Sequence, residues 1–407
     1  FKSKQFRDGY PQDYITKTTG IPYIPFETEK NVEIGNDIMT FMEQLFPQED
    51  LCKYMWDHLA SVLIGVKKEH AFNIYRGSGS NGKSILTDLM SQCLGDYKGT
   101  VPITLVTDKR SSIGGATPEV RREKLMPFFW NTIATQGQIY GNRNKNNKVD
   151  VANDQWFSYP GYSEILTGYF DTAIQSNDYP PNPNSNLFAY LNKQEPYKNK
   201  IAAFAAWNAF DRILNENVSG FPVINSSEPI SSILKDEKSI LISNMMRDSY
   251  QPWRETECLD VYTYYQAMHY LNTKKPKAMF ISFGETDEWA HDGAYNHYLD
   301  AAHKVDAWIK EIWNWAQATP GYKDNTYILV TTDHGRGFVD SWTSHGAKIP
   351  GASSIWFALL GPDVKKIGPL GEQTKDQQLF QKQLAATITK LIGQPFKAEH
   401  PIGDPIY

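Results

Sequence analysis

The chain has 407 residues, a formal net charge of −5 and a hydrophobic content of 41%. This length allows one large α/β enzyme or two to three smaller domains, and the hydrophobic content suffices for a large core. The acidic balance gives no general electrostatic attraction for nucleic acid, and an aromatic content of 13% excludes a disordered chain.

The cysteines limit the kind of metal site that the chain can form. They are three in number and far apart, so they predict neither a disulfide framework nor a zinc–thiolate cluster: Cys52, Cys93 and Cys258. Any metal is therefore expected on Asp, His and Ser side chains. No run of 18 apolar residues occurs, so no membrane span is expected. The chain starts at Phe1 without Met or a signal sequence, so its compartment cannot be read from the sequence. Its oligomeric state is also left open.

The N-terminal part of the chain predicts helices followed by a strand–loop–helix unit. Apolar residues recur at helical spacing over 37–66, and an apolar run at 71–75 predicts a short strand. A Gly- and Ser-rich loop follows, and 85–94 is again helical.

This loop fits the phosphate-binding P-loop pattern, with Gly77, Gly82, Lys83 and Ser84 at the required spacing. Glycines let backbone N–H groups turn toward phosphate oxygens, and the helix that follows adds the positive end of its dipole. In a working site Lys83 would contact the outer phosphates of Mg-ATP and Ser84 would bind Mg²⁺. The alternative is a Gly/Ser turn that caps a helix.

Residues 40–118 resemble the helicase ATPases of large DNA viruses, of the helicase–primase type. The matching residues are 72–84, Gly95-Asp96-Tyr97 and 101–119. Such an enzyme also needs an acidic strand for Mg²⁺, a sensor residue and an arginine finger. No apolar strand that ends in an acidic pair follows Glu119 at a suitable distance, so the resemblance ends there.

Beyond residue 119, strands alternate with helices. The expected elements are helix 120–130, a polar loop at 142–147, strand 201–207, helix 259–271, strand 277–284, helix 296–318, strand 327–330, strand 354–360 and helix 377–392. This alternation predicts an α/β fold with a central, mostly parallel sheet covered by helices on both faces.

Metal-capable side chains follow the strands of this region: Asp287 with His291, Asp333 with His334, and His345 in a later Ser-His-Gly loop. In open α/β sheets the carboxyl ends of the strands form the edge where ligands bind. Nitrogen and oxygen ligands of this kind suit Zn²⁺ or Mn²⁺. Taken singly, each pair also fits a capped turn or a helix start.

Ser158 is the candidate nucleophile. It precedes Tyr159-Pro160-Gly161 and a helix-like stretch at 164–168, so its hydroxyl is expected at a helix N-terminus. The alternative role for Ser158 is a simple helix cap.

Together these motifs resemble the alkaline phosphatase superfamily, in the branch of the nucleotide pyrophosphatase/phosphodiesterases and cofactor-independent phosphoglycerate mutases. The family's nucleophile motif falls on 158–160 with Thr167-Gly168, and its Asp-x-x-x-His, Asp-His-Gly and His-Gly motifs follow in order. The sulfatase branch is disfavoured because Tyr162 stands where that branch has an arginine.

The resemblance implies two metal sites, with zinc expected and manganese as the alternative. Metal one would be held by Asp287, His291 and His345. Metal two would be held by Asp333, His334, the Ser158 oxygen and a further aspartate. In the family that aspartate ends the first strand, which should lie before residue 117, where helicase-like sequence stands instead. We therefore predict that the first strand and this ligand are absent.

The implied reaction is two-metal phosphoryl transfer from a small phosphate monoester or diester through phosphoserine, with Asn177 on a phosphate oxygen. The resemblance also implies a secreted or periplasmic protein, with nucleic acid as an unexpected partner. The predicted domains are 1–118, a partial helicase-like P-loop segment, and 119–407, the hydrolase domain. Two alternatives stay open: a P-loop ATPase that acts on nucleic acid, and an inactive fusion of two partial domains.

Overall fold

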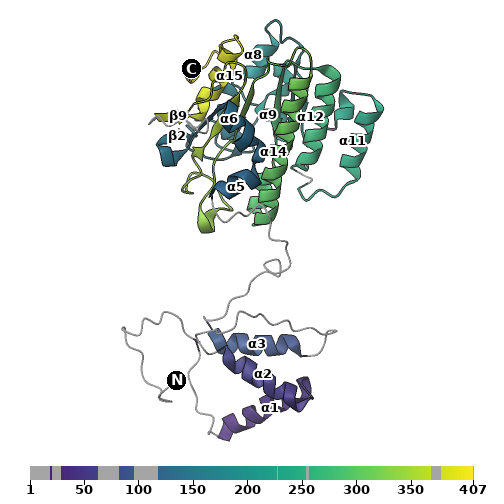
Figure 1. The fold of residues 1–407 in the computed structure, drawn as a ribbon, viewed down its shortest axis with the longest axis vertical. Coiled ribbons are helices and arrows are strands. Elements are labelled where there is room, and N and C mark those ends of the chain that lie inside the picture. Colours follow the sequence, from purple (N-terminus) through teal and green to yellow (C-terminus); the bar gives the residue numbers. More distant parts are fainter. Residues whose placement is uncertain are drawn as a thin grey trace. The chain divides into compact units, whose positions relative to one another are not determined.

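The computed structural model describes residues 19–20, 29–62, 82–95, 118–226, 228–253, 256–367 and 377–406. The chain forms two compact units, residues 1–108 and residues 109–407 (Figure 1). The domain boundary predicted near residue 118 adjoins residues outside those described and stays a prediction.

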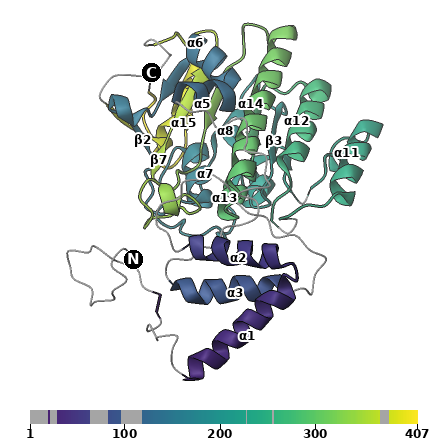
Figure 2. The same ribbon diagram turned by 60° about the horizontal axis from the view of Figure 1, so that its bottom comes forward.

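The described part of the first unit consists of three helices, which Figure 2 shows together: α1 (Glu29–Leu45), α2 (Glu49–Ser61) and α3 (Lys83–Leu94). Their apolar faces meet at Met42, Met55 and Leu86. Gly82 caps the start of α3 with φ of +77°, a conformation that favours glycine. Ser84 is exposed. Gly77, the predicted strand 71–75 and the side chain of Lys83 lie outside the described residues.

The second unit has an α/β architecture, as predicted. Its described strands form three short sheets, in the orders β1-β8-β6, β7-β2-β9 and β4-β3-β5. The strands are β1 (Gln138–Tyr140), β2 (Asn147–Asp150), β3 (Ile201–Ala205), β4 (Val223–Ile224), β5 (Ala278–Ser282), β6 (Ile328–Thr331), β7 (Ser354–Ile355), β8 (Phe357–Leu360) and β9 (Gln377–Phe380). The sheet around β3 is wholly parallel, the sheet around β8 is antiparallel, and β2 pairs parallel with β9 and antiparallel with β7.

The helices of this unit cover the sheets. The α-helices are α5 (Pro118–Leu125), α6 (Ala134–Gln136), α7 (Ser158–Thr167), α8 (Leu187–Asn192), α9 (Phe210–Ile213), α10 (Glu216–Ser219), α11 (Glu237–Asp248), α12 (Asp260–Lys274), α13 (Glu285–His291), α14 (Tyr295–Ala318) and α15 (Leu384–Leu391). A π-helical turn, η3 (Phe129–Ile133), and short 3₁₀ turns complete the unit: η4 (Arg143–Lys145), η5 (Ile230–Ser232), η6 (Val339–Ser341) and η7 (Gln381–Gln383).

β3 shows how the layers arise from the sequence. Its residues are all buried, and they alternate between two cores because successive side chains of a strand point to opposite faces. Ile201, Ala203 and Ala205 join the core with residues of α7 and α8, whereas Ala202 and Phe204 join the core with α12. A sheet covered on both faces is expected to use such a continuous apolar strand.

β5 and β6 differ from β3 in burial. β5 pairs with β3 and β6 pairs with β8, and no second neighbour is found for either among the described residues. The residues of β6 and most of β5 are only half-buried, although both strands are apolar. This exposure is what the predicted lack of a first strand would leave, and that lack stays a prediction.

Two of the predicted helices need correction. The helix expected at 377–392 begins instead as the strand β9, because Gln377–Phe380 pairs in register with β2, and only 384–391 is α-helical. The helix expected at 120–130 ends at Leu125 and is followed by η3, whose start is held by the carboxylate of Asp306.

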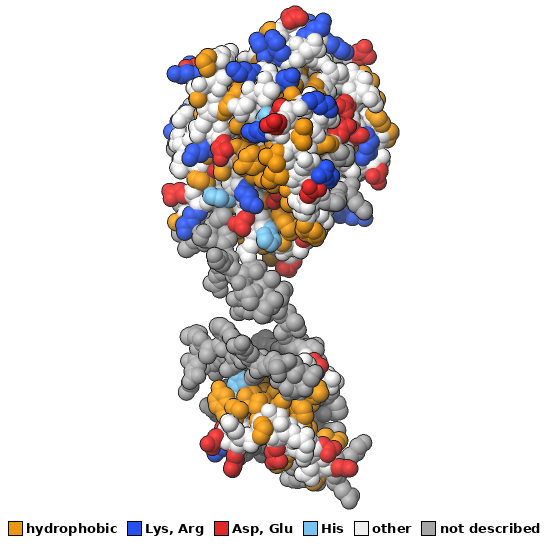
Figure 3. Space-filling view, turned by 90° about the vertical axis from the view of Figure 1, so that its right-hand side faces the viewer, with side chains coloured by type: hydrophobic (Ala, Val, Ile, Leu, Met, Phe, Trp, Pro, Cys, Tyr) orange, Lys and Arg blue, Asp and Glu red, His pale blue; other side chains and the backbone are white. Residues whose placement is uncertain are grey.

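Among the described helices, none combines the length and the apolar character needed to cross a bilayer. On the face of the second unit that Figure 3 presents, basic and acidic side chains are interspersed rather than segregated.

Candidate metal centre

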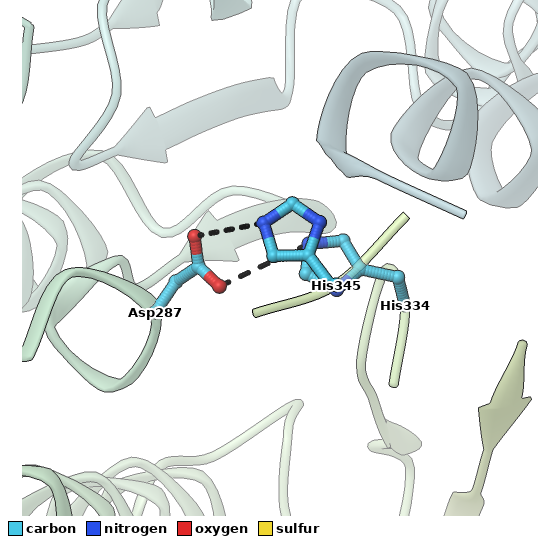
Figure 4. Close-up of side chains that lie close together, drawn as sticks. All are labelled: Asp287, His334 and His345. Atoms are coloured by element: carbon cyan, nitrogen blue, oxygen red, sulfur yellow. Dashed lines mark ion pairs between the residues drawn. The ribbon is translucent and has the colours of Figure 1, made fainter. Parts of the chain in front are cut away.

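The ends of β5 and β6 bring the predicted ligands together. α13 begins shortly after β5, and its Asp287 and His291 lie one turn apart on the same face. Asp333 and His334 follow β6, and His345 approaches from the loop after η6. Figure 4 shows Asp287, His334 and His345 facing one another, and their potential ligand atoms lie within 4.8 Å.

One group of atoms comprises Asp287, His291 and His345. The Nε2 atoms of His291 and His345 are 2.9 Å apart, and Asp287 Oδ2 lies 3.2 Å from the first and 3.8 Å from the second. Around a tetrahedral ion with bonds of about 2.0–2.1 Å, ligand atoms lie about 3.3 Å from one another. The three atoms therefore have the separation that a shared metal ion requires.

A second group comprises Asp333, His334 and Ser158. His334 Nε2 lies 3.4 Å from Asp333 Oδ2 and 3.4 Å from Ser158 Oγ. His334 Nδ1 is 2.8 Å from the carbonyl oxygen of Gly335 and donates to it, so Nε2 keeps its lone pair for a ligand or a proton. The rings of His334 and His345 stack at 3.9 Å, which places the two groups side by side.

Two glycines permit this close packing. A Cβ at Gly161 of α7 would collide with the carbonyl oxygen of Asp333, so only glycine lets the helix approach the loop after β6. A Cβ at Gly335 would collide with the carbonyl oxygens of Gly351 and Ser354. The Gly that follows Asp333-His334 is therefore required by contact with the next loop.

The electrostatics favour an ionised Asp287. Burial alone would raise the pKa of Asp287, but the hydrogen bond from His291 and the charges of His334 and Arg336 hold it well below its ordinary value. Burial instead raises the pKa of Asp333, and the charge of Asp287 adds to this.

His345 is held in its neutral form. Burial, followed by the charge of His334, lowers the pKa of His345 to about 4. Its buried Nδ1 has no hydrogen-bond partner among the described residues. Because metals bind the neutral imidazole, the ring is ready to act as a ligand over most of the pH range. The donor set of carboxylate oxygen and imidazole nitrogen thus fits a Zn²⁺-type ion.

Ser158 is the first residue of α7, where the helix dipole favours negative charge. Pro160 is tolerated there because N–H groups of the first turn have no partner within the helix. The N–H of Tyr159 donates to Asn177 Oδ1 at 2.9 Å. Asn177, Phe157 and His345 also line an open depression of about 350 Å³. The predicted nucleophile and phosphate ligand therefore lie beside the histidines.

Sequence reasoning gave no role to Arg336, which follows the Asp-His-Gly motif directly. Its Nη2 bonds to Asp287 Oδ1 and is 3.2 Å from the carbonyl oxygen of Asp287. Its Nη1 donates to the carbonyl oxygen of Trp342 at 3.3 Å. Arg336 therefore orients Asp287 and offsets its charge.

Glu164 was also missed. Its buried carboxylate accepts hydrogen bonds of 2.8–3.0 Å from the backbone N–H groups of Ala152, Asn153 and Lys382. The carboxylate thereby ties α7 to the loop that precedes Ser158. The presence of a Glu in the helix-like stretch at 164–168 was the only sequence signal for this role.

Comparison with known proteins identifies the class of enzyme. A model of the metalloenzyme superfamily matches residues 30–395. The chain therefore belongs to the metalloenzyme superfamily, the alkaline phosphatase-like group that its motifs predicted.

Curated relatives match a shorter stretch. The protein called "Putative helicase L207/L206" of Acanthamoeba polyphaga mimivirus is 37% identical over 119 residues, which are 29% of this chain and 12% of that protein. "Putative helicase 184R" of Invertebrate iridescent virus 6 is 31% identical over 117 residues, 29% of this chain and 12% of that protein. The chain thus spans about an eighth of these viral relatives.

Solved structures align with this chain at low sequence identity. The lipoteichoic acid synthase LtaP from Listeria monocytogenes has a TM-score of 0.45 at 16% identity, covering 69% of this chain and 68% of that one. An alkaline phosphatase superfamily protein from Vibrio parahaemolyticus has a TM-score of 0.43 at 13% identity, covering 71% and 64%. The phosphonate monoester hydrolase of Agrobacterium radiobacter has a TM-score of 0.45 at 12% identity, covering 69% and 71%.

Proposed function

We propose that the second unit is a metal-dependent phosphohydrolase with Ser158 as its nucleophile. The observation that carries this proposal is the approach of Asp287, His291 and His345 to separations that suit one metal ion, with Ser158 next to His334. Small phosphate monoesters or diesters are the proposed substrates, in line with the open depression that His345 and Asn177 line.

In this proposal Asp287, His291 and His345 hold one ion, and Asp333, His334 and Ser158 hold the other. Bound divalent metals would polarise phosphoryl oxygens and lower the pKa of a coordinated oxygen. Zinc is proposed for the first site because two of its ligands are imidazoles. We also propose that the second site lacks the further aspartate that the resemblance implies, and on that proposal we expect it to bind its ion more weakly.

The residues of the chain have distinct tasks. Ser158 Oγ attacks phosphorus, the ester oxygen departs with the electrons of the broken bond, and water later releases phosphate from phosphoserine. The start of α7 stabilises the negative charge on Oγ and on the phosphoryl group. Because the Oδ1 of Asn177 is engaged by the N–H of Tyr159, its Nδ2 is the group left to donate to a phosphate oxygen. Arg336 keeps Asp287 ionised and oriented.

The test measures hydrolysis of p-nitrophenyl phosphate and bis-p-nitrophenyl phosphate by the full chain after EDTA treatment and reloading with Zn²⁺ or Mn²⁺. Ser158→Ala should abolish turnover while zinc still binds. Ser232→Ala, at an exposed serine of the same unit, is the matched control. Absence of turnover with both metals, or equal turnover in Ser158→Ala, contradicts the proposal. A folded chain without stoichiometric metal would instead support the inactive fusion.

A second candidate function concerns the first unit. The viral relatives and the Gly82 cap of α3 favour a nucleotide-phosphate site. It would be supported if the chain bound ATP and Lys83→Ala abolished binding, with Lys53→Ala in α2 as the control. ATP binding that is equal in both variants would contradict this candidate.

A further inference from the structure

β5 and β6 are held together at both ends, although they do not pair with each other. Before the two strands, the hydroxyl of Tyr322 donates to the carbonyl oxygen of Pro276 at 2.6 Å. After them, Asp287 Oδ1 lies 3.9 Å from His334 Nε2. The strands therefore run in the same direction, yet among the described residues β5 pairs with β3 alone and β6 with β8 alone. We call the space between β5 and β6 the strand slot.

α7 covers one face of the strand slot. Its Gly161 packs on the carbonyl oxygen of Asp333, after β6, and the hydroxyl of Tyr162 accepts from Ser282 Oγ, at the end of β5, at 2.9 Å. Consecutive Cα atoms lie only about 3.8 Å apart, so a single turn of α7 touches both strand ends. Residues of both strands pack against the core that α7 shares: Phe280 and Leu329.

α12 and α14 cover the opposite face, and Figures 1 and 2 both show these helices side by side. Trp308 of α14 stacks on Tyr264 of α12 at 4.9 Å and meets Phe283, which follows β5, at 5.4 Å. Ile328 and Val330 of β6 pack against the core that α14 shares. Helices thus bridge β5 and β6 on both faces of the sheet layer, while the layer itself is interrupted between them.

The backbone of β5 presents unpaired groups to the strand slot. The carbonyl oxygen of Ser282 accepts from the N–H of Ala206 at 2.9 Å, and the N–H of Ala278 bonds to the carbonyl just before β3, so both residues direct their backbone groups to β3. Alternate residues of a strand face opposite neighbours, so Met279 and Ile281 direct their N–H and C=O groups to the open edge. The apolar side chains of β5 and β6 are mostly half-buried, although helices cover both faces.

We propose that the strand slot binds one extended apolar segment of a separate polypeptide, which adds a strand to the open edges of both β5 and β6. Only an extended backbone offers donors and acceptors to two edges at once, whereas a helix has already paired its own. Because both faces are covered by apolar side chains, the segment should carry about five consecutive apolar residues, as buried parallel strands do. This proposal does not depend on the hydrolase chemistry.

The test uses a fluorescein-labelled synthetic peptide of alternating valine and isoleucine, flanked by lysines for solubility, and the full chain in EDTA. We expect saturable binding in fluorescence anisotropy. A peptide with proline at its central position lacks an N–H for the ladder and should bind at least about tenfold more weakly. Hydrogen exchange should slow in the fragments that cover β5 and β6 when the valine–isoleucine peptide binds, and stay unchanged in β3.

A matched pair of variants locates the binding edge. Ile281→Pro removes an N–H that faces the strand slot and spares the pairing with β3, so it should weaken binding of the valine–isoleucine peptide at least about tenfold. Ile281→Val keeps this N–H and should bind as the parent chain does. If Ile281→Pro does not fold, the two peptides on the parent chain decide the matter.

Three results would overturn the proposal. The first is equal binding of both peptides, or no binding of either. The second is exchange in β5 and β6 that is already as slow as in β3 without peptide, which would mean that the chain fills the strand slot itself. The third is a dimer in analytical ultracentrifugation that Ile281→Pro converts to a monomer, which would make a second copy the occupant. All measurements are made without metal, so failure here is distinct from failure of the hydrolase proposal.

Discussion

Glu164→Gln is the change that most directly tests how α7 is held in place. The Oε1 of Glu164 accepts from the N–H groups of Ala152 at 2.8 Å and Lys382 at 3.0 Å. Its Oε2 accepts from the N–H of Asn153 at 3.0 Å and from the Nδ2 of Asn153 at 2.9 Å, and is 3.0 Å from the N–H of Ala152. All of these partners are donors, so the geometry suits an ionised carboxylate.

The size of the effect follows from these partners. Glutamine has one acceptor oxygen, and its amide NH₂ must replace the other. In the less damaging orientation the NH₂ takes the Oε1 position, so the N–H of Lys382 loses its acceptor. The N–H of Ala152 can still reach the remaining oxygen. An unsatisfied buried donor costs about 1–3 kcal/mol, and the remaining bonds lose the strength that an ionised acceptor gives them. We expect a loss of about 2–4 kcal/mol in the free energy of unfolding.

Urea unfolding followed by tryptophan fluorescence measures the free energy of unfolding of the second unit, because every tryptophan except Trp56 lies in residues 109–407. Glu399→Gln makes the same chemical change at an exposed position and should alter the free energy by less than about 0.5 kcal/mol. If Glu164→Gln unfolds at the same urea concentration as Glu399→Gln, the carboxylate does not hold the loop, and the reasoning fails.

Three more outcomes follow from the described contacts. Asp306→Ala should lower the free energy of unfolding by about 2–4 kcal/mol in urea, because two backbone N–H groups at 2.7 and 2.8 Å lose their acceptor. Burial, then the charge of Glu285, raises the pKa of Asp260 to about 8, so the folded chain keeps a proton that the unfolded chain loses near pH 4. Its stabilising contribution is complete below about pH 4 and lost as pH rises toward 8, and Asp260→Asn, unfolded in urea with EDTA, should flatten that slope. Hydrogen exchange should be slower in β3 than in the half-buried β6, and equal rates would contradict the burial difference.

The strands of the site could be predicted from the sequence because both are strongly apolar runs. The runs at 277–284 and 327–330 appear as β5 and β6 with ends shifted by one to two residues. Buried apolar strands are recognised by composition alone, and the ligands that follow them then share one edge of the sheet. The approach of the predicted histidines in space followed from this rule.

Other features depend on contacts that a single sequence does not contain. β9 begins with two glutamines and forms because β2 supplies a partner strand, which local periodicity does not reveal. Arg336 bonds to Asp287, which lies 49 residues away in the sequence. Glu164 accepts a hydrogen bond from Lys382, which lies 218 residues away. Such partners become identifiable only when the fold brings them together.

The contacts of Asp287 explain how one carboxylate serves both an arginine and a metal centre. Its Oδ1 is bonded to Arg336, whereas its Oδ2 faces the Nε2 atoms of His291 at 3.2 Å and His345 at 3.8 Å. A metal ion between the two imidazoles would therefore take Oδ2 as a monodentate ligand, and Arg336 would not have to move. The arginine keeps Asp287 ionised before an ion arrives and partly offsets its charge afterwards. Because Arg336 is also anchored on the carbonyl oxygen of Trp342, the loop after β6 fixes the orientation of a ligand that α13 supplies.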